Sequence, residues 1–168
     1  MTVTRLMIPV LCTWFMLGLI NLPAAAATKT LEVQVSAVTD GDSLRAGAMR
    51  LRLFGIDAPE LAQKCQSAEG HDYACGIVAR DRMRELAPIG TDLQCTHLDT
   101  DRYKRLVVSC KNENGDIAEQ LIAEGMAIAY RYYSHRYVPA ELYARENRLG
   151  IWAGSFQEPY EFRRAQRQ

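Results

Sequence analysis

Three short segments of this chain carry charged residues of the kinds that could cleave a phosphodiester. Segment 52–60 (RLFGIDAPE) places one arginine and two carboxylates within nine residues. Segment 40–43 (DGDS) adds two more carboxylates, and segment 101–105 (DRYKR) supplies a further arginine at Arg105. Two carboxylates can share a hard metal ion, another can act as a general base, and two arginines can hold a phosphate. These are the parts that a phosphodiesterase needs.

Length and composition favour one folded domain. The 168 residues are too few for two comfortable domains, and 48% of them are apolar, which argues against disorder. The formal net charge is zero, which argues against a broad basic surface that tracks long nucleic acid. A local cationic pocket is compatible with this balance, because a cleft focuses the field of a few arginines.

Residues 1–26 are expected to be a secretory signal peptide, which leaves 27–168 as a single domain. A cation at Arg5 is followed by an almost wholly apolar run over 6–22 and then by small residues. The alternative is an uncleaved membrane anchor, but 17 apolar residues are at the lower limit for a span, and Pro9 weakens the run further. We therefore expect an exported protein, either periplasmic or secreted.

The cysteines support the same expectation. Four remain once the signal is removed: Cys65, Cys75, Cys95 and Cys110. An even number in an exported chain suggests two disulfides, for which three pairings are possible. We favour Cys65–Cys75 and Cys95–Cys110, the second of which would join neighbouring strands, and each would contribute about 3 kcal/mol. A zinc site is disfavoured because the sequence has no Cys-x-x-Cys pair.

The hydrophobic pattern predicts strands and helices in one domain. Alternation and short apolar runs predict strands at 31–35, 49–53, 93–98 and 106–110. Helical spacing and end signals predict three helices: one over 67–86, one capped by Asp116 and ending before Gly125, and one from Pro139 to Gly150. Strands with interspersed helices indicate a small α+β domain with a barrel-like sheet.

These segments together resemble the thermonuclease (staphylococcal nuclease-like) family over residues of about 31–152. The resemblance rests on 40–43, 52–60, 101–105 and the closing 149–152 (LGIW), in that order and spacing. It implies an α+β fold with an OB-like five-stranded β-barrel and about three helices, in one nuclease-like domain. It also implies calcium-dependent cleavage of DNA and RNA, with the 5′-oxygen leaving to give 3′-phosphate ends.

The resemblance also implies a calcium site. By position, the metal ligands would be Asp42, Asp57 and the backbone carbonyl of Ala58, with Asp40 standing behind them. Many relatives have threonine where this chain has Ala58, but a carbonyl ligand tolerates that change. Carboxylate and carbonyl oxygens are the ligands that calcium prefers.

The catalytic groups follow from the same resemblance. Glu60 would be the general base, or the residue that positions the attacking water, and Arg52 and Arg105 would hold the scissile phosphate. The nucleotide pocket would be lined by Tyr103 and by Tyr130 or Tyr132. DNA and RNA would be the partners, no stable protein partner is implied, and we expect a monomer.

Each segment also has a structural interpretation. An Asp-Gly-Asp sequence is usually a turn, Arg52 could be a solvated strand residue paired with Glu60, and Arg105 could be an ordinary surface cation. The presence of all the segments in the family's order favours the catalytic interpretation. The rival function is a catalytically inactive nucleic-acid-binding module on the same OB-like barrel, or a structural protein. A pure binder has no need of Glu60, which argues against that rival.

Two features stand apart from this interpretation. Lys104 occupies a position where relatives commonly have glycine, and if the turn needs a positive φ, lysine adds strain of about 1 kcal/mol. Near the end of the chain, Arg163, Arg164 and Arg167 are expected to form a solvated tail, and the alternative is an auxiliary phosphate contact.

Overall fold

The computed structural model describes residues 29–167, so the signal peptide predicted at 1–26 lies outside the described residues. The strands are β1 (Lys29–Gln34), β2 (Ala37–Val38), β3 (Ser43–Ala46), β4 (Met49–Leu53), β5 (Ile56–Asp57), β6 (Cys65–Gln66), β7 (Asp72–Tyr73), β8 (Asp92–Thr100), β9 (Leu106–Asn112), β10 (Gly115–Asp116) and β11 (Ile128–Ala129). The helices are α1 (Cys75–Leu86), α2 (Ile117–Ala123), α3 (Val138–Glu146), the 3₁₀ helix η1 (Gly150–Ala153) and α4 (Pro159–Ala165). Within 29–167, none of these helices has the length and apolar character that a membrane crossing requires.

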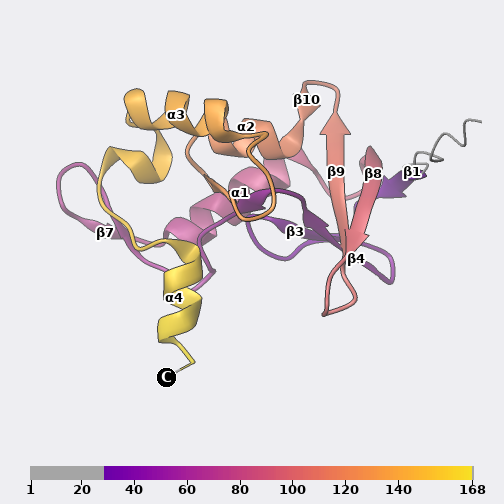
Figure 1. Cartoon of the computed structure of the whole chain (residues 1–168), viewed down its shortest axis with the longest axis horizontal. Helices are drawn as coiled ribbons and strands as arrows, with labels where there is room; N and C mark the ends of the chain where they lie inside the picture. Colours follow the sequence, from indigo (N-terminus) through magenta and orange to yellow (C-terminus); the bar gives the residue numbers. More distant parts are fainter. Residues whose placement is uncertain (1–28, 168) are drawn as a thin grey trace, which may run out of the picture.

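Five strands curl into a small barrel of OB-like order (Figure 1). Neighbours in the sheet follow the order β1-β8-β9-β4-β3-β2, with β4 and β9 parallel and the other pairs antiparallel. β1 and β2 are two parts of one strand that bends at Val35 and Ser36. The Val35 amide donates to the carbonyl of Thr91, next to β8, while the Ser36 amide donates to the carbonyl of Arg45 in β3. The bent strand therefore pairs with both edges of the sheet, which confirms the predicted α+β fold with an OB-like five-stranded barrel.

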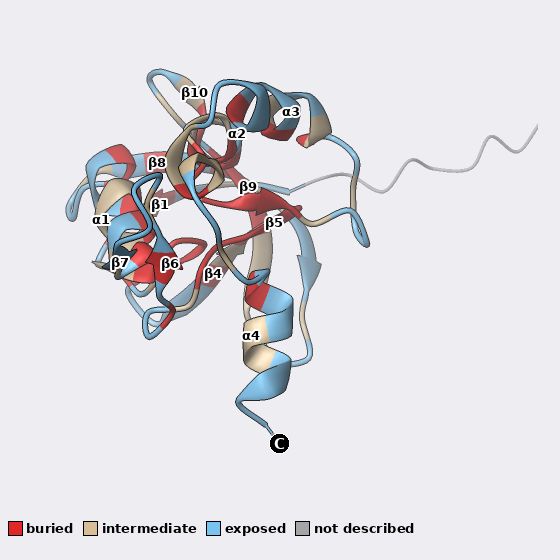
Figure 2. Ribbon diagram, turned by 90° about the vertical axis from the view of Figure 1, so that its left-hand side faces the viewer, coloured by how far each residue is buried: buried red, intermediate tan, exposed pale blue. Residues whose placement is uncertain are grey.

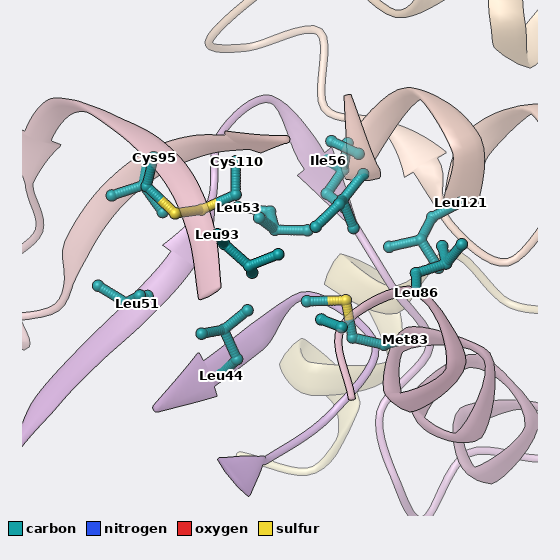
Figure 3. Close-up of a cluster of buried hydrophobic side chains, with 14 of the residues drawn as sticks. Leu44, Leu51, Leu53, Ile56, Met83, Leu86, Leu93, Cys95, Cys110 and Leu121 are labelled. Carbon is teal, nitrogen blue, oxygen red and sulfur yellow. A yellow bond between two sulfur atoms is a disulfide. The ribbon is translucent and has the colours of Figure 1, made fainter. Parts of the chain in front are cut away.

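One hydrophobic core fills the barrel and extends under the helices (Figures 2 and 3). Among its large members are side chains from β3, β4, β8, α1 and α2: Leu44, Leu51, Leu53, Leu93, Met83 and Leu121. Each such side chain contributes roughly 1.5–3 kcal/mol by leaving water. The Cys95–Cys110 disulfide joins directly opposed residues of β8 and β9 in this core, as predicted. This packing fixes the start of β3, next to Asp42, and the end of β5, at Asp57.

The helix predicted over 67–86 is wrong in its first part, since α1 begins at Cys75. Residues 65–73 instead form the β6–β7 hairpin, and the predicted Cys65–Cys75 disulfide ties this hairpin to the start of α1. Gly70 turns the hairpin with φ of +81°, a conformation that glycine adopts without strain. The apolar spacing of α1 does not continue into this polar segment.

The helix capped by Asp116 is confirmed. The Asp116 carboxylate accepts a hydrogen bond of 2.9 Å from the amide of Ala118, which satisfies a free donor in the first turn of α2. Gly125 follows the helix with φ of +69°, as expected of a residue just past a helix end. The helix predicted from Pro139 is α3, and residues 159–165 form the additional helix α4, which includes Arg163 and Arg164 of the expected tail.

Candidate active site

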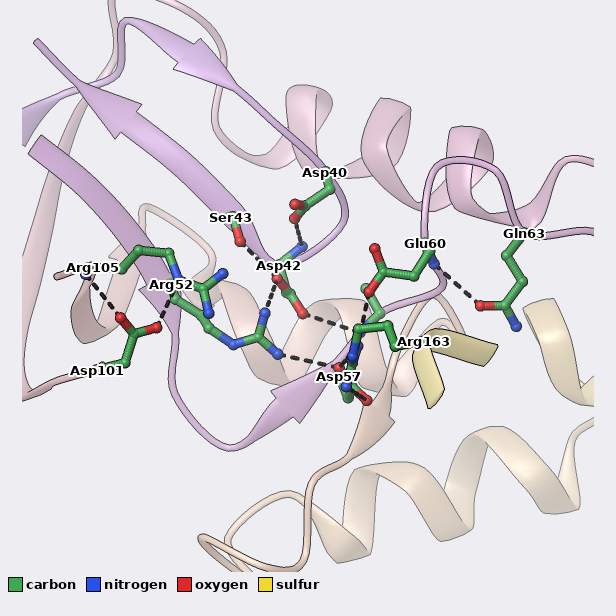
Figure 4. Close-up of polar contacts among 11 residues, drawn as sticks. Asp40, Asp42, Ser43, Arg52, Asp57, Glu60, Gln63, Asp101, Arg105 and Arg163 are labelled. Atoms are coloured by element: carbon green, nitrogen blue, oxygen red, sulfur yellow. Dashed lines mark hydrogen bonds and ion pairs between the residues drawn. The ribbon is translucent and has the colours of Figure 1, made fainter. Parts of the chain in front are cut away.

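Two buried carboxylates lie side by side where β3 begins and β5 ends, and Arg52 joins them (Figure 4). Asp42 is 3% exposed and Asp57 is 0% exposed. Nη1 of Arg52 donates to Oδ1 of Asp42 at 2.7 Å, and its Nη2 donates to Oδ1 of Asp57 at 3.1 Å. The pairing of β3 with β4 sets Arg52 opposite Ser43, next to Asp42. The alternative that Arg52 pairs with Glu60 is wrong, because its guanidinium holds the two aspartates.

A tight turn over residues 40–43 positions the Asp42 carboxylate. The Asp42 amide donates to Oδ1 of Asp40 at 3.0 Å, and the Ser43 hydroxyl donates to Oδ1 of Asp42 at 2.8 Å. The Ala58 amide donates to Oδ2 of Asp42 at 3.3 Å, which connects this turn to the segment after β5. Burial, and then the negative charge of Asp42, raise the pKa of Asp40 to about 7. Asp40 thus lies in a half-buried position beside a second carboxylate.

Glu60 is held through its backbone, which leaves its side chain facing the cleft. The Glu60 amide donates to Oε1 of Gln63 at 3.2 Å. Gln63 is fully buried, and its Nε2 donates to the carbonyl of Gln157 at 2.6 Å. On the other side, the first turn of α1 packs so closely that a Cβ on Gly76 would lie 1.8 Å from the Glu60 carbonyl oxygen. Gln63 and Gly76 are positioning residues that the sequence analysis missed, since neither type signals such a role.

Arg105 directly precedes β9, and Arg52 lies between it and Glu60 (Figure 4). The Nε of Arg105 donates to Oδ2 of Asp101 at 2.7 Å, and its backbone amide donates to Oδ1 of the same residue at 2.9 Å. Its guanidinium carbon is 5.6 Å from the ring centroid of Tyr103, a side chain that is 52% exposed. The turn that carries these residues has Lys104 at φ of +60°, so the positive φ suspected from the sequence is present.

A cleft of about 780 Å³ brings most of the predicted site residues together. Among its lining are Asp40, Asp42, Ala58, Glu60, Arg52, Arg105, Tyr103 and Tyr130. Asp57 lines a neighbouring cleft of about 500 Å³ instead, and it meets the site through its ion pair with Arg52. Tyr132 is 83% exposed and lines only that second cleft, whereas Tyr130 lines both, so Tyr130 is the better placed of the two alternatives.

Arg163 of α4 also enters the site, which the sequence analysis missed. Its Nη1 donates to Oδ1 of Asp57 at 2.8 Å and to Oε1 of Glu60 at 2.9 Å, and its Nη2 donates to Oδ2 of Asp57 at 2.9 Å. Burial raises the pKa of Asp57, and these hydrogen bonds offset part of that rise. The expectation that Arg163 belongs to a solvated tail is wrong. No local pattern could have indicated this contact, because 106 residues separate Arg163 from Asp57.

The donor set of the site fits a hard cation in its chemistry. Asp42 and Asp57 offer carboxylate oxygens, and Ala58, whose amide contacts Asp42, also carries a backbone carbonyl; calcium accepts both kinds of ligand together with water. Within residues 29–167 no group of three or more acidic, histidine or cysteine side chains has the arrangement of a metal site. Instead, guanidinium groups neutralise the two aspartates.

Comparison with known proteins gives the family. The family described as staphylococcal nuclease homologue matches residues 50–154. The succinoglycan biosynthesis protein ExoI of Rhizobium meliloti is 32% identical over 70% of this chain, which spans 62% of that protein's length. The micrococcal nuclease of Shigella flexneri is 32% identical over 88% of this chain and 95% of its own length. An uncharacterized endonuclease of Haemophilus influenzae is 28% identical over 80% of this chain and 74% of its own.

The matched region carries the predicted site residues from Arg52 to Tyr130, whereas Asp40 and Asp42 precede it. It begins just before Arg52, includes the β8–β9 turn with Arg105, and ends after η1. It stops short of α4, so Arg163 lies outside it. With more than half of its residues matched and a fold of the expected order, the chain belongs to the staphylococcal nuclease homologue family.

Proposed function

We propose that this chain is an exported, calcium-dependent phosphodiesterase that hydrolyses DNA and RNA with little sequence preference. The 5′-oxygen would leave, which gives 3′-phosphate ends. The observation that carries this proposal is the joining of Asp42 and Asp57 by Arg52, at the floor of a cleft that Glu60 and Arg105 also face. Membership in the family, and relatives named as nucleases and endonucleases, support the hydrolase class.

The roles proposed for the charged residues follow from their placement. Calcium held by Asp42, Asp57 and the Ala58 carbonyl would offset the charge of the phosphate and orient water. The guanidinium groups of Arg52 and Arg105 would each donate two hydrogen bonds to the phosphate. Because the five-coordinate transition state carries more negative charge than the substrate, these donors stabilise it more strongly.

Glu60 is proposed to take the proton of the attacking water. Its side chain is 36% exposed at the cleft while its backbone is held by Gln63 and abuts Gly76, so the carboxylate is positioned without being buried. Proton transfer of this kind contributes roughly 10²- to 10⁴-fold to a rate. The rival function is a binding module without catalysis. It is disfavoured because it gives the Glu60 carboxylate no role in a cleft that binds phosphate.

The substrate class is supported by the aromatic lining of the cleft. Tyr103, Tyr130 and Tyr133 stand beside the arginines that line it. Such side chains stack on unpaired bases irrespective of sequence, which favours single-stranded substrate. The two disulfides support export, since they persist in oxidising compartments. We further propose that residues 27–168 form a single domain, which acts as a monomer without a stable protein partner.

The test is cleavage of single-stranded DNA by the purified chain, with calcium and with a chelator. We expect cleavage that needs calcium. Cleavage that is indifferent to the chelator would keep the nuclease and overturn the calcium assignment, and an absence of cleavage in both conditions would favour the binding module.

Two variants test the residue assignments. Glu60→Gln and Arg105→Ala are each expected to lower kcat by about 10²-fold or more, with an unchanged far-ultraviolet circular dichroism spectrum. Glu69→Gln is the matched control, because Glu69 is an exposed glutamate on the β6–β7 hairpin. Wild-type turnover in Glu60→Gln would remove that residue from the mechanism.

A further inference from the structure

The guanidinium of Arg163 covers the oxygens that the proposed chemistry needs (Figure 4). Both oxygens of Asp57 and Oε1 of Glu60 accept hydrogen bonds from it, at 2.8 to 2.9 Å. Oδ1 of Asp57 is shared with Arg52, so two guanidinium groups converge on one buried carboxylate. Arg163 thus stands where a cation would meet Asp57 and where water would meet Glu60.

The position of α4 is built into the fold. The chain before α4 forms a two-way backbone bridge with the β6–β7 hairpin, since the Gln66 amide donates to the Ser155 carbonyl at 2.8 Å and the Ser155 amide returns a bond of 3.2 Å. A Cβ on Gly154 would lie 2.0 Å from the Gln66 carbonyl oxygen, so the two backbones are in close contact. Gln63 then links Gln157 to the Glu60 segment. The same segment that positions Glu60 therefore positions α4.

Arg163 and a divalent cation make competing demands on Asp57. A cation bound by Asp57 needs a lone pair that the Arg163 fork now occupies, and two positive charges at this distance repel each other. Arg163 bonds both oxygens of Asp57, so a cation approaching this carboxylate meets the Arg163 guanidinium first. Occupation by Arg163 and occupation by calcium are thus alternative states of the same oxygens.

We infer that Arg163 is an intramolecular counter-ion of Asp57 and Glu60 which a divalent cation must displace; this inference rests on the calcium site of the proposed function. Tyr160 and Arg163 lie three residues apart on α4, Arg167 follows just beyond its end, and all three line the main cleft. The displaced guanidinium therefore stays at the wall of the cleft, where an anionic substrate enters. The Arg163 side chain thus acts as a latch, which calcium opens by displacing it from Asp57 and Glu60.

The size of the effect follows from competition. The apparent affinity for calcium equals the intrinsic affinity multiplied by the fraction of molecules in which Arg163 has left Asp57. A latched fraction of about 90–99% lowers that affinity by about 10- to 100-fold. Removing the latch restores the intrinsic affinity of the carboxylates.

The experiment is a calorimetric titration of the purified chain with calcium, without nucleic acid. Arg163→Gln is expected to bind calcium about 10- to 100-fold more tightly than the wild type. Arg164→Gln is the matched control: it removes the same charge from the next residue of α4, whose exposed guanidinium has no hydrogen bond or ion pair within residues 29–167. The control is expected to change the affinity by less than about threefold, because exposed charges are screened. Arg163→Lys, which keeps the charge and loses the fork, should fall between the two.

A second readout follows the helix itself. We expect backbone amides of α4 in the wild type to exchange with deuterium faster when calcium is added, and those of Arg163→Gln to exchange fast in both conditions. Equal calcium affinity in Arg163→Gln and Arg164→Gln, or weaker binding by Arg163→Gln, would overturn the inference. Calcium binding by none of the variants would overturn it together with the calcium assignment, while the cleavage assay would still judge the nuclease separately.

Discussion

Lys104 offers a quantitative test of how the turn before Arg105 is built. Its φ of +60° lies in the left-handed region, within the turn closed by the Lys104 amide donating to the Asp101 carbonyl at 2.9 Å. A residue with a Cβ costs about 1–2 kcal/mol there, and glycine does not. Glycine also gives the unfolded chain more freedom, which costs about 0.4–1 kcal/mol. The difference predicts that Lys104→Gly stabilises the fold by about 0.5–1 kcal/mol.

The measurement is the free energy of unfolding in urea, supported by the melting temperature. A gain of this size raises Tm by about 1–4 °C in a chain of this length. Lys104→Ala is the control, because it removes the charge and keeps the Cβ, so it should gain nothing. Equal stability of the glycine and alanine variants would refute the reasoning, since backbone strain would then not decide the result. Both variants should retain the Arg105–Asp101 pair and hence activity within about threefold.

The remaining predictions concern two buried contacts. Asp116→Ala should cost about 2–4 kcal/mol in urea unfolding, because α2 loses its cap and the buried hydroxyl of Tyr137, which donates to Asp116 at 3.0 Å, loses its acceptor. A loss below about 1 kcal/mol would contradict that account. Gly76→Ala should displace the Glu60 backbone and lower kcat by about tenfold or more while the melting transition stays cooperative. Wild-type kcat in this variant would show that Glu60 tolerates the shift.

The strands were predictable because their pattern is local. Residues 49–53 alternate in the sequence, and in β4 Leu51 and Leu53 are 1% exposed while Arg50 and Arg52 lie on the other face. The helix start was not predictable in the same way. Where α1 begins depends on a disulfide to Cys65 and on the pairing of the β6–β7 hairpin, and neither is visible in a helical repeat.

The residues of the candidate site likewise fall into those that local sequence motifs indicate and those that only tertiary contacts bring in. The charged residues of the motifs could be listed from the sequence, and the structure brings them to one cleft, although their catalytic roles stay predictions. Arg163 could not be listed, because its partnership with Asp57 and Glu60 depends on the backbone bridge at Ser155 and on the packing of Gln63. Tertiary contacts place an ordinary-looking arginine into the site.

The zero net charge of the chain conceals a segregation of charge inside the cleft. Six arginines and five acidic residues line it, and the buried Asp57, which pairs with Arg52, makes the two signs equal. Asp42, Asp57 and Glu60 gather at one end with Arg163, while Arg105 stands at the other with Tyr103. A cation that displaces Arg163 from the acidic end adds positive charge and also frees a guanidinium that faces the cleft. Both changes favour an anionic substrate, so we expect calcium to bind before the phosphate and to strengthen its binding.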